Sequence, residues 1–455
     1  MVSQRSTIKQ IGISLLTGFI VLCVPASVSA QNDAAGSVES LTLTQCIDYA
    51  LKSQPAVNQA QIGVRVAKTT NAINLSGWLP QVNAGATATH YNTLPTTFIS
   101  DSAGPSLPTH SGIVNTIIPQ LSASQTIFNP QLLYAAHSAR LYVKEAEQIM
   151  DSAKINAVVT VSKAFYNLLL TLEQINVLKE DTARLDRNVM DTYHQFVGGI
   201  VDETDYEEAV ITLNNSLVQL KQQIENVAPN YATLKQLMGY PPEKQFNVAF
   251  DTLQMMQEIM FDTAQKLDYE NRIEYKLVKT FKELQHQQTS YYDLAFLPTA
   301  SVYYNYYYEY ENNTSTSIFD KAYPYSYFGL SLNIPLFTGF ARLENIHKSK
   351  LQEDILNWQQ VNVKSQIFTD YSTALANYKS NLYNWKMMND NRTRAKNVYR
   401  IVSLQYKEGI VAYLNMIVAE SNLIASEIGY TNALFQLLSS KIDVQKAMGV
   451  IPYNQ

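Results

Sequence analysis

In two long segments, apolar residues recur at alternating spacings of three and four, which places them on one face of packed helices. No proline or glycine interrupts the first segment, from Gln131 to Val197, or the second, from Phe340 to Tyr406. As helices, these 67-residue segments would each reach roughly 100 Å. The pattern therefore predicts two very long helices. Their apolar rows are Val158, Val161, Phe165, Leu168, Leu172 and Ile175 in the first, and Phe368, Tyr371, Leu375, Tyr378, Leu382 and Trp385 in the second.

The two segments belong to a sequence unit that occurs twice. A Gly-Ile-Val motif at 199–201 recurs at 409–411, and Met-Gly at 238–239 recurs at 448–449, each 210 residues later. The two apolar rows are displaced by the same 210 residues. A shared motif with a shared helical phase indicates an internal duplication. The predicted domains are a first repeat at 31–240, a connector at 241–260 and a second repeat at 261–455.

Each repeat is expected to hold a short helix, two strands, the long helix and a return helix. In the first repeat the short helix should cover 44–76, with a break near Pro55. The return helix should cover 205–238, and Pro229 within it should kink or end it.

The second repeat follows the same plan. Its short helix is expected at 261–296, and its return helix should end at Met448 because Gly449 follows. The four strands of the two repeats are expected at about 81–94, 114–128, 299–310 and 325–337, with a polar loop between the first two.

The last strand has the alternation of a membrane-barrel strand. Its apolar residues would face lipid and its polar residues a watery interior. The strand before it is nearly solid tyrosine, which favours a membrane interface. A strand of a soluble sandwich is the alternative. Four strands cannot close around a lumen, but three chains giving four each could. The expected lipid-facing residues are Phe328, Leu330, Leu332 and Ile334.

The helical periodicity alone would equally fit an ordinary two-stranded coiled coil. The strand segments favour a membrane protein instead. A secreted or periplasmic structural coiled-coil protein without a pore remains the alternative function.

The first 30 residues have the layout of a secretory signal peptide. Arg5 and Lys9 precede an apolar stretch at 11–24, and cleavage is expected after Ala30. Lipidation at Cys23 is disfavoured, since a large Leu22 precedes it. Beyond this peptide we expect no apolar helix long enough to span a membrane, so any membrane segment should be a strand. Cys46 would be the one remaining thiol and is interpreted as a packed residue.

Composition and motifs give no sign of catalysis. The net charge is −5 with 16% charged residues, which does not favour nucleic-acid binding. No nucleotide-binding, hydrolase or metal-ligand motif occurs, and the six histidines are scattered. Met255, Met256 and Met260 are interpreted as helix packing rather than a metal site. We therefore expect no enzymatic activity, no cofactor and no metal.

Six motifs in order resemble the TolC family of outer-membrane efflux channels over essentially the whole mature chain. They are the opening Leu-Thr-Leu-Thr-Gln-Cys-Ile-Asp-Tyr-Ala-Leu at 41–51, Pro55, Leu-Pro at 79–80, Ile-Pro-Leu-Phe-Thr-Gly at 334–339, and the hairpin turns at 196–201 and 406–411.

The resemblance implies a mainly α fold with a small β part, built from coiled-coil hairpins and four transmembrane strands per chain. It implies a homotrimer with a twelve-stranded barrel in the outer membrane, in contact with lipid, and a twelve-helix barrel in the periplasm. Such a protein passively conducts substrates delivered by an inner-membrane pump of RND or ABC type through a periplasmic adaptor, in tripartite efflux or type I secretion. The adaptor would bind the hairpin tip at Gly198, Gly199, Ile200, Val201, Gly409, Ile410 and Val411.

The residues expected to close the tip depart from the family pattern. Its tyrosine falls on Tyr406 and an aspartate partner on Asp205, so a hydrogen bond between these two is expected. The usual arginine position holds Val411, and the usual ring of aspartates falls on Asn415 and Val418. Our hypothesis is that apolar packing and Tyr406 close the tip, with Glu420 the nearest acidic candidate.

Overall fold

The computed structural model describes residues 39–99, 107–249, 259–262 and 266–453. The chain divides into two units after Glu39, and apart from Glu39 itself, the first residue of a short strand, all that follows concerns the second. The expected signal peptide, Cys23, Met255 and Met256 lie outside the described residues. Met260 is largely exposed and in no helix, so its interpretation as a packed helix residue is wrong.

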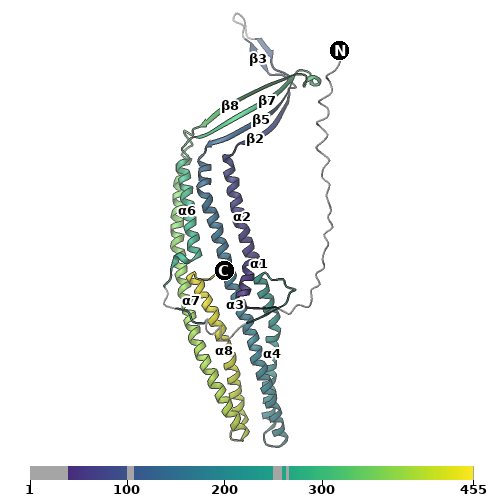
Figure 1. The fold of residues 1–455 in the computed structure, drawn as a ribbon, viewed down its shortest axis with the longest axis vertical. Helices are drawn as coiled ribbons and strands as arrows, with labels where there is room; N and C mark the ends of the chain where they lie inside the picture. The colour runs from purple at the N-terminus through teal and green to yellow at the C-terminus, as the bar shows by residue number, and fades with distance from the viewer. Residues whose placement is uncertain (1–38, 100–106, 250–258, 263–265, 454–455) are drawn as a thin grey trace. The chain divides into compact units, whose positions relative to one another are not determined.

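Long helices dominate the unit, with one four-stranded sheet above them (Figure 1). The helices are α1 (Leu43–Ser53), α2 (Pro55–Leu75), α3 (Pro130–Val197), α4 (Glu203–Met238), α6 (Ile273–Leu294), α7 (Ala341–Lys407) and α8 (Tyr413–Met448). The strands are β1 (Glu39–Leu41), β2 (Gln81–His90), β3 (Thr96–Ile99), β4 (Leu107–His110), β5 (Asn115–Phe128), β6 (Phe246–Val248), β7 (Thr299–Asn312) and β8 (Ala322–Asn333). Short 3-10 turns lie at Ser76–Trp78, Tyr269–Asn271 and Ser315–Ser317.

The four expected strands form one antiparallel sheet in the order β2-β5-β7-β8. The segment expected as a polar loop contains a further hairpin, β3-β4, in which Thr96 pairs with His110. Its β-branched residues favour extended backbone, and a two-stranded hairpin tolerates Pro108 because both strands are edges. The third pair, β1-β6, joins the start of the unit to the connector.

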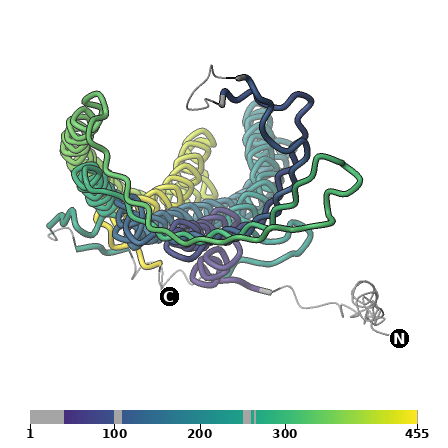
Figure 2. The backbone as a smooth tube through the Cα atoms, turned by 90° about the horizontal axis from the view of Figure 1, so that it is seen from above, coloured from purple at the N-terminus to yellow at the C-terminus, as the bar shows by residue number. Residues whose placement is uncertain are grey.

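The helices continue the order of the strands. In the upper layer α2 packs on α3, α3 on α6, and α6 on α7. In the lower layer α3 and α4 form one hairpin, α7 and α8 form the other, and α3 contacts α8. Seen from above, these elements follow an arc (Figure 2). Within this arc α3 lies in the interior, with neighbours on both sides, while α7 lies at an edge.

The two equivalent apolar rows therefore have different surroundings. In α3, Val161, Phe165 and Leu168 are fully buried in the main core. In α7, Tyr378 is buried but Phe368 is exposed. We expected no helix apolar enough to span a membrane, and this expectation was wrong. By length and composition, α3 contains an 18-residue stretch that is apolar enough. Of this stretch, 56% is buried inside the unit, as expected of a core helix.

Each return helix ends in a left-handed glycine at a break between shorter elements. Gly239 has φ +67°, and a Cβ there would lie 2.5 Å from the Ser53 carbonyl oxygen, where α1 ends. Gly449 has φ +71°, and a Cβ there would lie 2.7 Å from the Asn271 carbonyl carbon, just before α6. Only glycine fits such close approaches at positive φ.

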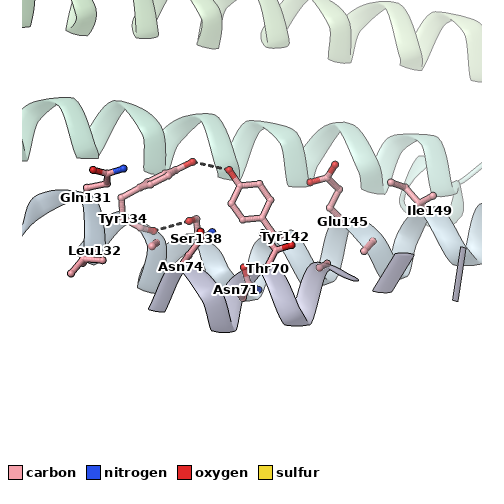
Figure 3. A pocket seen from close by; sticks show the side chains of 13 residues that line it. Thr70, Asn71, Asn74, Gln131, Leu132, Tyr134, Ser138, Tyr142, Glu145 and Ile149 are labelled. Atoms are coloured by element: carbon pink, nitrogen blue, oxygen red, sulfur yellow. Dashed lines mark hydrogen bonds between the residues drawn. The ribbon is translucent and has the colours of Figure 1, made fainter. Parts of the chain in front are cut away.

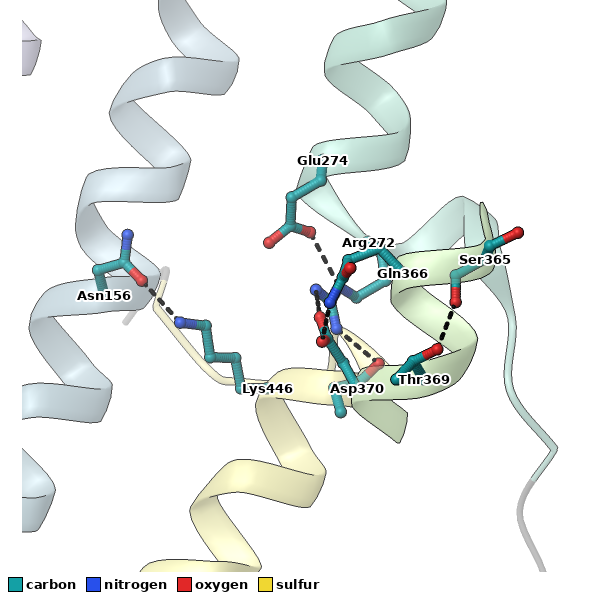
Figure 4. Close-up of polar contacts among 9 residues, drawn as sticks. Asn156, Arg272, Glu274, Ser365, Gln366, Thr369, Asp370 and Lys446 are labelled. Carbon is teal, nitrogen blue, oxygen red and sulfur yellow. Dashed lines mark hydrogen bonds and ion pairs between the residues drawn. The ribbon is translucent and has the colours of Figure 1, made fainter. Parts of the chain in front are cut away.

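The second short helix starts at Ile273 rather than at the expected residue 261. Arg272 just before it has extended backbone, with φ −77° and ψ 128°, so the helix begins after it, and its side chain is buried. Its guanidinium donates to the Ala447 carbonyl oxygen at 3.0 Å and pairs with Glu274 at 2.9 Å and Asp370 at 3.4 Å (Figure 4). This fixes the start of α6 against the end of α8 and the middle of α7.

Pro229 lies inside α4 without ending it. The helix continues to Met238, and the Thr233 hydroxyl donates to the Pro229 carbonyl oxygen at 3.0 Å.

Candidate functional site

The two hairpin turns have the same local structure. Gly199 and Gly409 both have positive φ, of +69° and +71°. The amide of the next residue donates 2.8 Å back to a carbonyl near the end of the long helix, at Gln195 and Gln405 respectively. These bonds satisfy the orphan carbonyls of each helix end. Each turn therefore reverses the chain through backbone hydrogen bonds within its own hairpin.

Apolar side chains differ in exposure at these turns. Ile200 and Ile410 are 76% and 69% exposed, while Val201 and Val411 are partly covered. Val411 packs against a small core formed by Ala209, Tyr406, Tyr413 and Met416, which we call the tip core. The exposed apolar surface of the tip thus consists of the two isoleucines more than the valines.

The tip core joins the two hairpins just above the turns. Ala209 belongs to α4, Tyr406 to α7, and Tyr413 and Met416 to α8. The rings of Tyr406 and Tyr413 lie 5.4 Å apart. Burial raises the pKa of both tyrosines, so both stay neutral at physiological pH.

The expected bond between Tyr406 and Asp205 is not found among the described residues. The Tyr406 hydroxyl donates instead to the side-chain oxygen of Gln195 on α3. Asp205 lies in the first turn of α4, where a carboxylate is favoured by the helix dipole. Partial burial, with Asp202 and Glu208 nearby, raises its pKa.

Removing the Tyr406 hydroxyl should loosen the contact between the hairpins. Tyr406→Phe deletes the bond to Gln195 but keeps the ring, and should cost about 1 kcal/mol of this contact. We expect faster amide hydrogen exchange at the adjoining ends of α3 and α7. Asp205→Asn is the matched control and should leave this exchange unchanged. Equal effects of the two variants would instead restore Asp205 as the partner.

A buried ionic cluster joins α3 to α8 farther from the tip. The Arg184 guanidinium donates to Asp181 on its own helix and to Glu420 on α8, the latter at 2.9 Å. The Asn188 amide donates to the other Glu420 oxygen at 2.6 Å. The guanidinium also lies 5.1 Å from the ring centre of Tyr399 on α7. We call these five residues the ionic cluster.

Glu420 is therefore not a free acid of a closing ring. Its side chain is only 1% exposed and faces α3 inside the unit. Burial raises the pKa values of both Glu420 and Asp181, partly offset by Arg184. Asn415 and Val418, the other expected ring positions, are exposed.

The sheet has one apolar and one polar face. Even-numbered residues of β8 share the face of Val302 and Tyr304, because Val302 pairs with Leu330 and Tyr304 with Phe328. The expected lipid-facing residues Phe328, Leu330 and Leu332 are all exposed on that face. Ile334 is also exposed but follows the last residue of β8.

The sequence matches the family described as Outer membrane efflux protein over residues 46–240 and 286–450. The chain belongs to the outer membrane efflux protein family. The unmatched segment between the two ranges contains the connector and the start of α6.

Solved outer membrane channels share this fold. The outer membrane protein VceC of Vibrio cholerae superposes with a TM-score of 0.70 at 14% identity, covering 90% of this chain and 96% of VceC. The CmeC outer membrane channel of Campylobacter jejuni gives 0.71 at 17% identity, covering 91% and 87%. The MtrE outer membrane channel of Neisseria gonorrhoeae, in its open state, gives 0.69 at 17%, covering 90% and 88%. No curated protein matches the sequence significantly.

This outer membrane efflux protein also has a groove beside α2, missed by the sequence analysis. The groove has a volume of about 510 Å³ and is lined by residues of α2 and α3 (Figure 3). The hydroxyls of Tyr134 and Tyr142 are 2.9 Å apart, and the Asn71 amide donates to the Ala139 carbonyl at 2.6 Å. Burial raises the pKa of Glu145 in its wall.

Sequence reasoning also missed Arg184, Asn188 and Gln195. All three lie on α3, about one to four helical turns before the first glycine turn. A polar residue in a long helix normally indicates a solvated face, so nothing in their spacing marked them as partners of groups on α7 and α8. The one available signal was the position of Arg184 three residues after Asp181, where ion pairs form within a helix.

Proposed function

We propose that this protein is the outer-membrane exit duct of a tripartite efflux or type I secretion system, formed by three copies of the chain. The observation that carries this proposal is the open sheet. Within the described sheet, β2 and β8 are the end strands and each pairs on one side only. Backbone groups of an open edge cannot be left unpaired in a membrane. Pairing of β8 with β2 of the next copy would close a barrel.

The helical edges support the same assembly. Near its start, α7 exposes Leu351, Ile355 and Trp358. At the opposite edge α2 exposes Ile62, Val66 and Ile73. Apolar rows of this size on soluble helices normally meet a partner. In a closed ring α7 of one copy would pack beside α2 of the next.

The groove beside α2 fits this arrangement. Its α3 wall extends from Gln131 to Ile149, close below the sheet. The exposed apolar residues of α7 lie at a similar distance below the sheet, because α7 starts at Ala341 just after β8. We propose that α7 of the neighbouring copy covers the groove.

Membership in the family supports the remaining parts of the proposal. The sheet would lie in the outer membrane and the helices in the periplasm, after export through a cleaved signal peptide. A periplasmic adaptor would bind the two turns, chiefly through Ile200 and Ile410. An RND or ABC pump would supply the energy, so the duct itself needs no enzymatic activity.

Fractionation, mass measurement and conductance test the proposal together. The protein should sediment with outer membranes, purify in detergent as a trimer and conduct ions in planar lipid bilayers. Trp358→Glu should weaken the trimer while leaving the helical content unchanged, because a charge would be buried at the contact. A soluble protein without conductance would favour the structural coiled coil and contradict the proposal.

A further inference from the structure

The polar face of the sheet has its own aromatic pattern. The register pairs Tyr307 with Tyr325, Asn305 with Tyr327, and Tyr303 with Gly329. Directly paired residues of a sheet share a face, and alternate residues of a strand share it too. The odd-numbered residues of β7 and β8 therefore lie together, opposite Phe328 and Leu330. We call Tyr303, Tyr307, Tyr325 and Tyr327 the tyrosine cluster.

The rings of this cluster are ordered against one another. Tyr307 stacks on Tyr325 at 4.9 Å with an angle of 13°, and on Tyr327 at 5.9 Å with an angle of 18°. The hydroxyls of Tyr307 and Tyr327 are 3.3 Å apart. Tyr303 meets Tyr327 edge to face at 6.2 Å. Three nearly parallel rings thus form one aromatic surface.

Gly329 makes room for this arrangement. A Cβ at this position would lie 2.5 Å from the Tyr303 hydroxyl oxygen, so the ring lies over the glycine. Tyr325 and Tyr327 remain 44% and 45% exposed. Their rings stay open to a ligand on the polar face, although Tyr307 between them is partly covered.

The charges of the sheet gather on the same face. In β2, β5, β7 and β8 the only Asp, Glu, Lys or Arg residues are Glu309 and Glu311. Both are odd-numbered residues of β7, and Glu309 pairs with Tyr323. They lie near the end of β7 that is farther from the helices (Figure 1). Lys321, just before β8, lies 4.9 Å from the ring centre of Tyr323, so a cation already stacks on a tyrosine here.

We propose that the tyrosine cluster with Glu309 is a binding site for aromatic organic cations passing through the duct. This inference rests on the proposed function, because only closure of the barrel turns the polar face into a lumen. A planar ring would stack on Tyr325 or Tyr327, and its positive charge would be attracted by the ring faces. Glu309 would add a carboxylate at the outer end. The negative charge of an anion would be attracted neither by the ring faces nor by Glu309.

Block of the pore current by three probes tests the site. The trimer is reconstituted in planar bilayers, and ethidium, tetraethylammonium and naphthalene-2-sulfonate are added from the side of the sheet. Ethidium combines a ring with a charge, whereas the other two are an aliphatic cation and an aromatic anion. We expect ethidium to block at a concentration at least about tenfold below either, as one desolvated cation–π contact gives a factor of this size.

Two variants locate the block. Tyr325→Leu with Tyr327→Leu should raise the half-blocking ethidium concentration about tenfold. The matched control, Tyr304→Leu with Tyr306→Leu, changes the opposite face of the same sheet and should leave the block unchanged. Glu309→Gln removes a charge without altering packing, and should weaken block by both cations about threefold. It tests the site even if the double leucine variant fails to assemble.

The outcomes separate the two proposals. Equal block of a conducting trimer by ethidium and tetraethylammonium overturns the binding site but not the duct. The same holds if ethidium block is unchanged both in the Tyr325→Leu, Tyr327→Leu variant and in Glu309→Gln. Equal weakening by the two leucine pairs also overturns it. A wild-type protein without conductance overturns both.

Discussion

Replacing Arg184 with methionine is expected to lower the free energy of unfolding by about 3–5 kcal/mol, the cost of breaking a buried ion pair by removing one partner. Methionine keeps most of the volume but leaves Glu420 and Asp181 buried without their cation. One oxygen of Asp181, Oδ2, already has no hydrogen-bond partner among the residues that the structure describes. The loss should appear as separation of α3 from α8, because the cluster joins these two helices.

Denaturant unfolding and hydrogen exchange can measure this effect. Faster amide exchange is expected in α3 and α8 around the cluster, while the sheet should exchange as before. Arg187→Met is the matched control, since Arg187 is exposed on the same helix. Adding Glu420→Gln to Arg184→Met should recover part of the loss by removing the stranded charge. A loss equal to that of Arg187→Met would show that the cluster does not hold the hairpins together.

The same cluster predicts the direction of a pH effect. Burial raises the pKa values of Asp181 and Glu420, and also that of Glu427, which lies outside the cluster farther along α8. The folded protein therefore retains protons that the unfolded chain has released. Their contribution to stability is complete below about pH 4 and is lost as the pH rises through the raised values. Arg184 on α3 offsets part of this shift for all three, and Lys396 on α7 does so for Glu427.

Mild acid should therefore strengthen the contact between the hairpins. In Arg184→Met the pH dependence should become steeper, because the raised pKa values lose their main compensating charge. Unfolding midpoints measured at several pH values would test this sign. A contact that weakens on acidification would contradict it.

The sequence predicted the elements well where the evidence was periodic. The first long helix begins one residue before its expected start, and both glycine turns lie where the repeat placed them. The strand faces also followed from alternation, since Phe328 and Leu330 lie opposite Tyr327 and Gly329. Such patterns depend on local backbone geometry, and the duplicated sequence contains the same pattern in both repeats.

Periodicity does not say what covers a face. The rows of α3 and α7 have the same spacing, but only α3 has helices on both sides, so Phe165 is buried and Phe368 is exposed. The partners of Tyr406 and Glu420 depend on the rotation of α7 and α8 against α3. A one-dimensional pattern does not fix that rotation. The partner of Tyr406 was therefore predicted wrongly, and no partner was predicted for Glu420.

Gly239→Ala is expected to cost about 2–4 kcal/mol of stability, combining backbone strain at positive φ with a steric clash. The added Cβ would lie 2.5 Å from a backbone oxygen of Ser53, which cannot move without shifting the junction of α1 and α2. The matched control is Gly409→Ala. Gly409 has nearly the same φ, +71°, but a Cβ there meets nothing within 4 Å.

The two variants separate strain from close approach. Gly409→Ala should lose only the backbone term, about 1–2 kcal/mol. Gly239→Ala should lose clearly more, and Gly449→Ala should resemble it, because its Cβ would lie 2.7 Å from the backbone of Asn271. Chemical denaturation of each purified variant gives the comparison. Equal losses at Gly239 and Gly409 would mean that the return helices do not need to pack so closely against the breaks in the short elements, and that the duplicated glycines serve the helix ends alone.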